Sequence, residues 1–410
     1  MNELKMVKPR ILILMHYMEL GGAESALLGL LQSIDPDRVD VDLFIYDHRG
    51  ELMRFIPTDK VHLLPEIKGY KMIERPLKEC VVAGQWGIAL GRLLAKITVD
   101  KNPAPRGMDD WRIFKRVADC VERFLPKIKY DVEYDLAISF QTPHNSVISK
   151  VRAKKKLGWI HTDYSVVFVN IENELPVWSE LDYIASISEE VGKNFVRIFP
   201  ALREKLISIE NILCPDFIHK MAEELSVSLC SDTFTTCLLT IGRFSPQKKM
   251  EDIPIICRGI VDSGIDVRWF IIGYGSKVIE NTILDNIKKE HVEGKVIVLG
   301  KKDNPYPYIK ACDIYVQPSR YEGKSIAVRE AQIMCKPVIV TDYPTASSQV
   351  KNGVDGVIVP MEIEACVEGM ASFIQNKEKQ NAIVNYLSSH DYGNQSEIEK
   401  IYKIAGCRIC

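Results

Sequence analysis

The sequence predicts an α/β protein with two doubly wound domains, each built around a parallel β-sheet. Short runs of β-branched and aromatic residues alternate with amphipathic stretches, and such unbroken apolar runs are typical of strands buried on both faces. A polar segment over 223–236 interrupts this alternation, which then resumes. The length of 410 residues is also more than one hydrophobic core ordinarily supports.

The order of the elements divides the chain around the polar segment. We expect a first domain over 1–222, a linker over 223–236 and a second domain over 237–383. A helix that opens with two glycines is expected over 21–34, directly after the first strand. The predicted strands are 11–15, 41–47, 134–140, 156–162, 183–188 and 205–211 in the first domain, and 237–244, 268–275, 295–300, 314–319 and 336–342 in the second.

Composition excludes several classes of protein. A net charge of −2 gives no global field for nucleic acid, so no nucleic-acid partner is expected. No run approaches the roughly 18 apolar residues of a membrane span, and the N-terminal stretch lacks the layout of a signal peptide. The 11 cysteines are scattered, which favours reduced thiols in a cytoplasmic protein; the lone pair Cys407 and Cys410 is a weak metal signal.

Ligands of doubly wound sheets bind at the carboxyl ends of the strands, and three glycine or basic motifs lie there. Gly22 stands at the first strand-to-helix turn, where a helix N-terminus favours anions. In "IGRFSPQKK" a guanidinium and an ammonium, from Arg243 and Lys248, could clamp a diphosphate, although a solvated basic loop is the alternative. In "IIGYGS", Gly273 and Gly275 are compatible with the close approach of a ligand.

The segment "SRYEGKSIAVREAQ" carries two glutamates eight residues apart, Glu322 and Glu330. A strand is expected before it and a helix over 325–335, so Glu322 lies in the loop and Glu330 inside the helix. Backbone N–H groups of residues 323–326 point out of the helix toward an anion. Two carboxylates around such donors suit the hydroxyls of a sugar and a ribose flanking a phosphate better than an acid–nucleophile pair.

The Glu-x7-Glu motif in "EGKSIAVRE", the "IGRFSPQKK" loop and the "GGAE" turn resemble the GT-B glycosyltransferases of family 4, which include bacterial capsular and exopolysaccharide transferases. The similarity is strongest over 237–360 and looser in the N-terminal half, where "WIHTDY" and "SISEEV" carry it. The resemblance implies two Rossmann-like domains facing a central cleft, with the acceptor on the first and the nucleotide-sugar on the second. It also implies that a last helix, within 384–410, crosses back to the first domain.

The same resemblance assigns a role to each site residue. Arg243 and Lys248 would stabilise the leaving diphosphate, Glu322 would face the transferred sugar, and Glu330 would bind the ribose hydroxyls. His161 would serve in the catalytic cleft, although a structural histidine is an equal alternative. The remaining donor-binding residues would be Gly22, Gly273, Gly275, Gly323, Lys324, Ser325 and Ile326. Lys324 differs from the pattern of the family, since many members have an apolar residue at the corresponding position.

The implied activity is transfer of a sugar, with retention, from a nucleotide-diphosphate-sugar to a carbohydrate or polyprenyl-linked acceptor in cell-surface polysaccharide biosynthesis. A UDP-sugar is the first expectation and a GDP-sugar the next, with no metal and no cofactor. The alternative is an inactive subunit that binds or chaperones an active transferase, which the four intact residues Arg243, Lys248, Glu322 and Glu330 disfavour.

A peripheral contact with the inner face of an anionic membrane is a further hypothesis, placed on the basic, aromatic stretch 106–129. One helical stripe there holds Trp111, Phe114, Val117 and Val121, with basic residues elsewhere on the helix. An ordinary core-facing helix is the competing interpretation of the same pattern.

Overall fold

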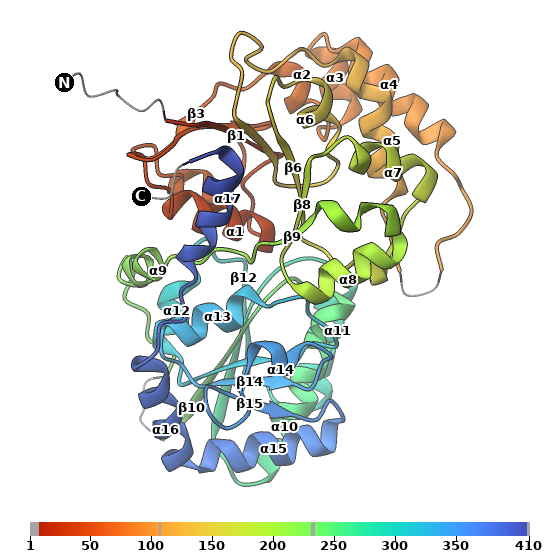
Figure 1. The fold of residues 1–410 in the computed structure, drawn as a ribbon. Helices are drawn as coiled ribbons and strands as arrows, with labels where there is room; N and C mark the ends of the chain where they lie inside the picture. Colours follow the sequence, from red (N-terminus) through yellow and green to blue (C-terminus); the bar gives the residue numbers. More distant parts are fainter. Residues whose placement is uncertain (1–7, 106–107, 231–233, 408–410) are drawn as a thin grey trace, which may run out of the picture. The chain divides into compact units, whose positions relative to one another are not determined.

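The computed structural model describes residues 8–105, 108–230 and 234–407. The chain forms two compact units, one of Met1–Ile212 with Asn394–Cys410 and the other of Leu213–Gly393 (Figure 1). Each unit has its own parallel sheet, and the eleven predicted strands are all present, each shorter than or close to its predicted range. The α/β prediction with two doubly wound domains is confirmed.

The first unit has a seven-stranded sheet in the order β3-β2-β1-β5-β6-β8-β9. All neighbouring pairs are parallel, and the reversal of strand order falls between β1 and β5. The strands are β1 (Arg10–Met15), β2 (Asp40–Ile45), β3 (His62–Leu63), β5 (Leu136–Ser139), β6 (Lys156–Ile160), β8 (Tyr183–Ser186) and β9 (Leu206–Ser208), with a separate pair β4 (Asp109–Asp110) and β7 (Val167–Phe168). The helices are α1 (Gly22–Gln32), α2 (Lys68–Lys71), α3 (Leu77–Val82), α4 (Trp86–Thr98), α5 (Arg112–Val121), α6 (Asn145–Ser149), α7 (Ile171–Ser179), α8 (Glu189–Ile198) and α17 (Ile398–Ala405).

The second unit has a six-stranded parallel sheet in the order β12-β11-β10-β13-β14-β15, the 3-2-1-4-5-6 order of a dinucleotide-type fold. Side chains alternate between its faces, so that Trp269 lies in one buried core and Phe270 in the other. The strands are β10 (Thr236–Ile241), β11 (Val267–Ile272), β12 (Val296–Gly300), β13 (Ile314–Gln317), β14 (Val338–Thr341) and β15 (Val357–Val359). The helices are α9 (Pro215–Ala222), α10 (Ile253–Asp262), α11 (Lys277–Lys289), α12 (Tyr306–Ala311), α13 (Ile326–Ile333), α14 (Ala346–Gln349), α15 (Ile363–Gln375) and α16 (Lys377–Ser388).

Both predicted boundaries of the second domain differ from those of the structure. The second unit begins at Leu213 rather than at 237, because α9 buries Ile218 against Ile333 of α13. It ends at Gly393 rather than at 383, because α16 contributes Leu387 to the core of this unit. The segment predicted as a linker, 223–236, therefore belongs to the second unit, and its residues 231–233 lie outside the described part.

The C-terminal segment packs on the first unit from Asn394 onward, so the segment that returns is shorter than the predicted 384–410. The backbone N–H of Asp35 donates to the Tyr402 hydroxyl of α17 at 2.8 Å. Arg38 pairs with Glu399, with Nη2 and Oε2 2.9 Å apart. Cys407 lies near the Arg38 carbonyl, whereas Cys410 falls outside the described residues.

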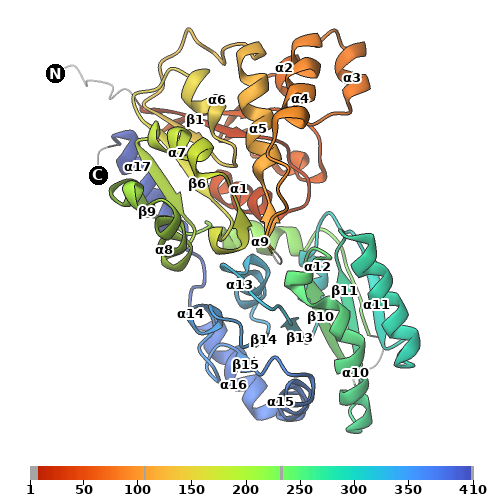
Figure 2. The same ribbon diagram turned by 90° about the vertical axis from the view of Figure 1, so that its right-hand side faces the viewer.

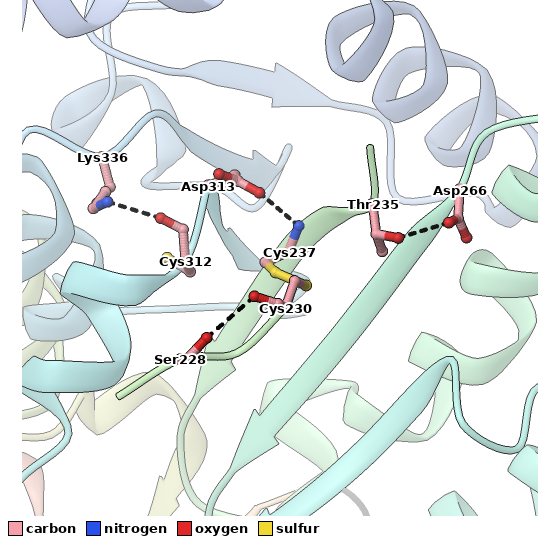
Figure 3. The surroundings of a disulfide bond; sticks show 8 residues. All are labelled: Ser228, Cys230, Thr235, Cys237, Asp266, Cys312, Asp313 and Lys336. Atoms are coloured by element: carbon pink, nitrogen blue, oxygen red, sulfur yellow. Dashed lines mark hydrogen bonds between the residues drawn. A yellow bond between two sulfur atoms is a disulfide. The ribbon is translucent and has the colours of Figure 1, made fainter. Parts of the chain in front are cut away.

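A disulfide between Cys230 and Cys237 contradicts the expectation that the cysteines are all thiols (Figure 3). The Cα atoms of the two cysteines lie 6.4 Å apart, within the range of a disulfide. The backbone N–H of Cys237 donates to Asp313 at 2.8 Å and so fixes the start of the strand (Figure 3). Eight other described cysteines are free.

Candidate functional site

The candidate site of the second unit lies where its strand order reverses, at the carboxyl ends of β10 and β13. The loop after β10 carries Arg243 and Lys248, and the loop after β13 carries Glu322. Two hydrogen bonds fasten these loops together: the Arg320 N–H donates to the Gln247 carbonyl at 2.8 Å, and Gln247 Nε2 donates to the Tyr321 carbonyl at 3.0 Å. The structure thus joins two motifs that are far apart in the sequence.

Lys248 and Glu322 form an ion pair in this site, with Nζ and Oε1 2.6 Å apart. The Glu322 side chain is 5% exposed and that of Lys248 is 18% exposed. The same carboxylate oxygen accepts from Ser319 Oγ at 2.5 Å and from Gln317 Nε2 at 3.3 Å. An ammonium has three N–H donors, so the pair leaves Lys248 with donors for a second anion.

Gly273 and Gly275 lie where the loop after β11 packs against the loop after β10, and this close contact leaves no room for a side chain at either position. A Cβ at Gly273 would lie 2.1 Å from the Gly242 carbonyl oxygen, and one at Gly275 would lie 2.8 Å from the Phe244 carbonyl oxygen. Gly275 also has a φ of +147°, which side chains disfavour. The Phe244 N–H donates to the Tyr274 carbonyl at 2.8 Å, so the loop after β11 supports the loop that carries Arg243. The arginine itself is exposed.

Helix α13 begins at the predicted place, with Ser325 as its N-cap. The Ser325 N–H donates to Gln349 Oε1 at 3.0 Å, and Gln349 Nε2 donates back to the Ser325 carbonyl at 2.6 Å. The Ser325 amide, for which the sequence predicts a phosphate contact, is therefore engaged within the protein. The predicted donor contacts of Gly323, Lys324 and Ile326 stay predictions.

Glu330 is buried on α13, where Tyr306 of α12 donates its hydroxyl to Glu330 Oε1 at 2.8 Å. Burial raises the pKa of Glu330 to about 7, and the hydrogen bond from Tyr306 opposes that rise. The carboxyl group therefore changes its charge near neutral pH. In its ionised form, the Glu330 carboxylate can accept hydrogen bonds from hydroxyl groups of a ligand.

Replacing Glu330 with glutamine should stabilise the ligand-free protein at pH 8. Because the folded-state pKa is raised, the wild-type carboxyl favours the folded state below about pH 4.5 and loses that contribution as the pH rises through about 7. We expect Glu330→Gln to gain about 2 kcal/mol at pH 8, since one unpaired amide N–H offsets part of the larger pKa effect. Urea unfolding at pH 8 and pH 4 measures this gain, and an equal gain at both pH values would contradict it.

Two predicted residues belong to the first unit. Gly22 opens α1 and is exposed, and a Cβ there would meet no atom within 4 Å. His161 follows β6, with its ring centroid 4.5 Å from that of Phe140. Burial lowers the pKa of His161 to about 3, so the imidazole is neutral at physiological pH and acts as a hydrogen-bonding group rather than as a cation.

Four residues that hold the site together are absent from the predictions made on the sequence, namely Tyr306, Gln317, Ser319 and Gln349. Gln317 and Ser319 are polar residues at the end of the apolar run "IYVQPS", a signal that could have placed them in the site. Within the described part of the chain, no group of three or more His, Cys, Asp or Glu residues is arranged to hold a metal ion. Among the described helices, none is both long and apolar enough to cross a bilayer.

Comparison with known proteins places this site within a recognised family segment. Residues 223–389 match the family Glycosyl transferases group 1. This segment contains Arg243, Lys248, Glu322 and Glu330.

Curated relatives are similar over part of their length. The chain is 25% identical over 150 residues to the N-acetylgalactosamine-N,N'-diacetylbacillosaminyl-diphospho-undecaprenol 4-alpha-N-acetylgalactosaminyltransferase of Campylobacter jejuni, covering 36% of this chain and 40% of that protein. It is 26% identical over 156 residues to the UDP-Gal:alpha-D-GlcNAc-diphosphoundecaprenol alpha-1,3-galactosyltransferase of Escherichia coli, covering 35% and 40%. The matched segments thus span less than half of these relatives.

Solved structures match over nearly the whole chain. Anabaena HepE in complex with UDP and glucose superposes with a TM-score of 0.65 at 15% identity, covering 97% of this chain and 99% of that one. TarM superposes with a TM-score of 0.66 at 12% identity, covering 98% and 99%. These likenesses confirm the GT-B fold, with two Rossmann-like domains.

Proposed function

We propose that this protein is a glycosyltransferase that moves a sugar from a nucleotide-diphosphate-sugar to a carbohydrate or lipid-linked acceptor. The observation that carries the proposal is the Lys248–Glu322 pair at the strand reversal of the second unit, inside the segment that matches the transferase family. A cation fixed beside a buried carboxylate is suited to hold a diphosphate and the sugar attached to it.

In the proposed reaction the bond between the anomeric carbon and the diphosphate oxygen breaks, and an acceptor hydroxyl forms the new bond to that carbon. The nucleoside diphosphate leaves with the electron pair, and its oxygen takes the proton of the acceptor hydroxyl. Arg243 and Lys248 stabilise the negative charge on the leaving group, Glu322 orients the sugar, and Glu330 binds the ribose hydroxyls. Backbone groups of Gly273, Gly275, Gly323, Lys324, Ser325 and Ile326 complete the donor-binding region, with the Ser325 amide shared with Gln349.

The first unit supplies Gly22 and His161 in this proposal. A Cβ at Gly22 would meet open space, so packing within the protein does not require a glycine at this position. The absence of a side chain instead leaves room for a ligand to approach the backbone closely. A neutral His161 is suited to hydrogen-bond a hydroxyl of the donor sugar or the acceptor. Each assignment remains a proposal about one residue.

We propose a UDP-sugar as donor, with a GDP-sugar next, and a polyprenyl-linked acceptor in cell-surface polysaccharide biosynthesis at the inner face of the membrane. The names of the Campylobacter and Escherichia relatives refer to diphospho-undecaprenol acceptors, and HepE was solved with UDP-glucose. Retention of the anomeric configuration and a reaction without metal or cofactor complete the proposal.

A donor-hydrolysis screen tests this function. The purified chain is incubated with UDP-, GDP- and dTDP-sugars, with and without EDTA, and the released nucleoside diphosphate is measured. We expect a UDP-sugar to be cleaved faster than in buffer, with EDTA leaving the rate unchanged. Strict dependence on Mg²⁺ or Mn²⁺ would contradict the metal-free mechanism, and failure of the chain to bind or cleave any donor would favour the inactive-subunit alternative.

A further inference from the structure

Helix α4 of the first unit directs its large apolar side chains toward solvent. We call Trp86, Leu90, Leu93 and Ile97 the α4 row, because these four residues recur at helical spacing along one face of α4. Their exposed fractions are 65% for Trp86, 50% for Leu90, 49% for Leu93 and 61% for Ile97. Contiguous exposed apolar surface of this kind marks an interaction site more often than a single exposed residue does.

The packed face of α4 combines the buried Ile88 with small residues that let the helix approach its neighbour closely. Gly87, Gly91 and Ala95 recur every four residues and face α5 and the turn that follows it. A Cβ at Gly91 would lie 2.8 Å from the Cys120 carbonyl oxygen, and one at Gly87 would lie 2.6 Å from the Phe124 ring. Both views show α4 beside α3 and α5 (Figures 1 and 2). The small residues thus let α4 lie close to α5, and of the large apolar side chains of α4 only Ile88 is buried.

Basic side chains lie toward both ends of the α4 row, and the nearby Asp100 is paired with Arg112. Helix α4 has no acidic residue, and its Lys96 is exposed next to Ile97, whereas Arg92 donates to the Met72 carbonyl at 3.2 Å and does not belong to the rim. Arg116 of α5 donates from Nε to Thr98 Oγ1 at 2.8 Å, at the same end of α4. Arg123, in the turn after α5, is also exposed. Apolar side chains with a basic rim are the pattern of a helix that lies in the interface of an anionic membrane.

In the stretch 106–129, for which the sequence suggests a membrane contact, most of the predicted apolar stripe is buried or half-buried. Val121 of α5 is buried, and its Cγ1 would be 3.1 Å from a Cβ at Gly91, so it packs under α4. Trp111 and Val117 are half-buried, and Phe114, at 60% exposed, is the one strongly exposed member of the predicted stripe. Residues 106 and 107 of that stretch lie outside the described part. The contiguous exposed apolar surface is therefore on α4.

We propose that the α4 row inserts into the interface of an anionic phospholipid bilayer, with Lys96, Arg116 and Arg123 on the lipid phosphates. Trp86 is suited to the interface because its ring has an apolar body and a polar N–H. A second copy of this chain fits the surface less well, because a two-fold contact would bring the two basic rims together. The proposal goes beyond transferase activity, since membrane binding can be measured without any sugar nucleotide.

Vesicle binding of the full chain tests the proposal. The protein is sedimented with vesicles of phosphatidylcholine alone and of phosphatidylcholine mixed with phosphatidylglycerol. We expect binding to the mixed vesicles that weakens with salt, and a blue shift of tryptophan emission on binding. The double variant Leu90→Glu with Leu93→Glu should lower the partition coefficient by at least about tenfold.

Two control variants sharpen the experiment. The double variant Val278→Glu with Leu284→Glu places the same two charges at other exposed apolar positions, 74% and 40% exposed on α11, and should bind vesicles like the wild type. Trp86→Phe should still bind but lose most of the blue shift, because Trp159, Trp178 and Trp269 are buried and Trp111 is half-buried, which leaves Trp86 as the strongly exposed tryptophan. The proposal is overturned if the wild type stays in the supernatant with both vesicles, or if the double glutamate variant of α4 binds equally well. A lipid-free dimer that the double variant of α4 converts to a monomer would assign the row to a second copy instead.

Discussion

Replacing Lys248 with alanine should lower the turnover number of sugar transfer about a hundredfold to a thousandfold, with little change in the KM for the donor. In the proposed mechanism Lys248 faces the diphosphate, whose negative charge grows as the sugar leaves. A hydrogen-bond donor held in place where negative charge develops typically contributes about a hundredfold to a thousandfold to the turnover number. It does so because it stabilises the transition state more than the ground state. Its ion pair with Glu322 at 2.6 Å fixes the ammonium in advance of substrate binding. Initial rates with the donor identified by hydrolysis measure the effect.

Loss of Lys248 also leaves the buried Glu322 carboxylate without its cation, which could destabilise the protein. The double variant Lys248→Ala with Glu322→Gln removes that uncompensated charge, because Ser319 and Gln317 can still hydrogen-bond the amide. If the low turnover arises from the missing cation, it persists in the double variant, whose unfolding midpoint recovers. Lys277→Ala, at an exposed position on α11, is the matched surface control and should keep full activity. Wild-type turnover in the Lys248→Ala protein would refute the assigned role.

The sequence predicts the sheets and the position of the site because both depend on local patterns. Strands buried on both faces of a parallel sheet have unbroken apolar sequences. Because the strands are parallel, the residues that follow them all lie at the carboxyl edge of the sheet. Arg243, Lys248 and Glu322 follow such strands, and the family resemblance selects them, together with Glu330, as candidate site residues. Their mutual contacts cannot be predicted in this way, since Lys248 and Glu322 are separated by 74 residues and meet through the packing of two loops.

Other features depend on tertiary packing that no local pattern encodes. Helix α9 lies near the predicted linker, yet it belongs to the second unit because Ile218 meets Ile333 across a long stretch of chain. The apolar residues of α4 follow a helical period that usually marks a core-facing stripe. The direction of this stripe is decided by the glycines on the other face, which pack against the Cys120 backbone and the Phe124 ring. Periodicity predicts the stripe itself but not whether it faces protein or solvent.

Binding of the UDP-sugar should strengthen about twofold from pH 7 to pH 8 and should weaken toward about tenfold for each pH unit well below 7. Burial raises the pKa of Glu330 to about 7 in the free protein, so the carboxyl is increasingly protonated as the pH falls. An ionised carboxylate accepts hydrogen bonds from both ribose hydroxyls, and the bound state therefore requires loss of the proton. The diphosphate of the donor keeps its two charges over this range, so the pH dependence belongs to the protein. Calorimetric titration in several buffers measures both the affinity and the released proton.

Variants of Glu330 and Tyr306 separate binding from positioning. Glu330→Ala should bind the donor about a hundredfold to a thousandfold more weakly at pH 8, because two hydrogen bonds to a charged group are lost, and its affinity should no longer depend on pH. Tyr306→Phe removes the hydroxyl that stabilises the ionised carboxylate at 2.8 Å, so the pKa of Glu330 should rise further and the midpoint of the affinity curve should move to higher pH. Above that midpoint the Tyr306→Phe protein should approach wild-type affinity, which a general disruption of the site would prevent. A flat affinity curve from pH 5 to pH 8 in the wild type would show that Glu330 does not bind the donor as a carboxylate.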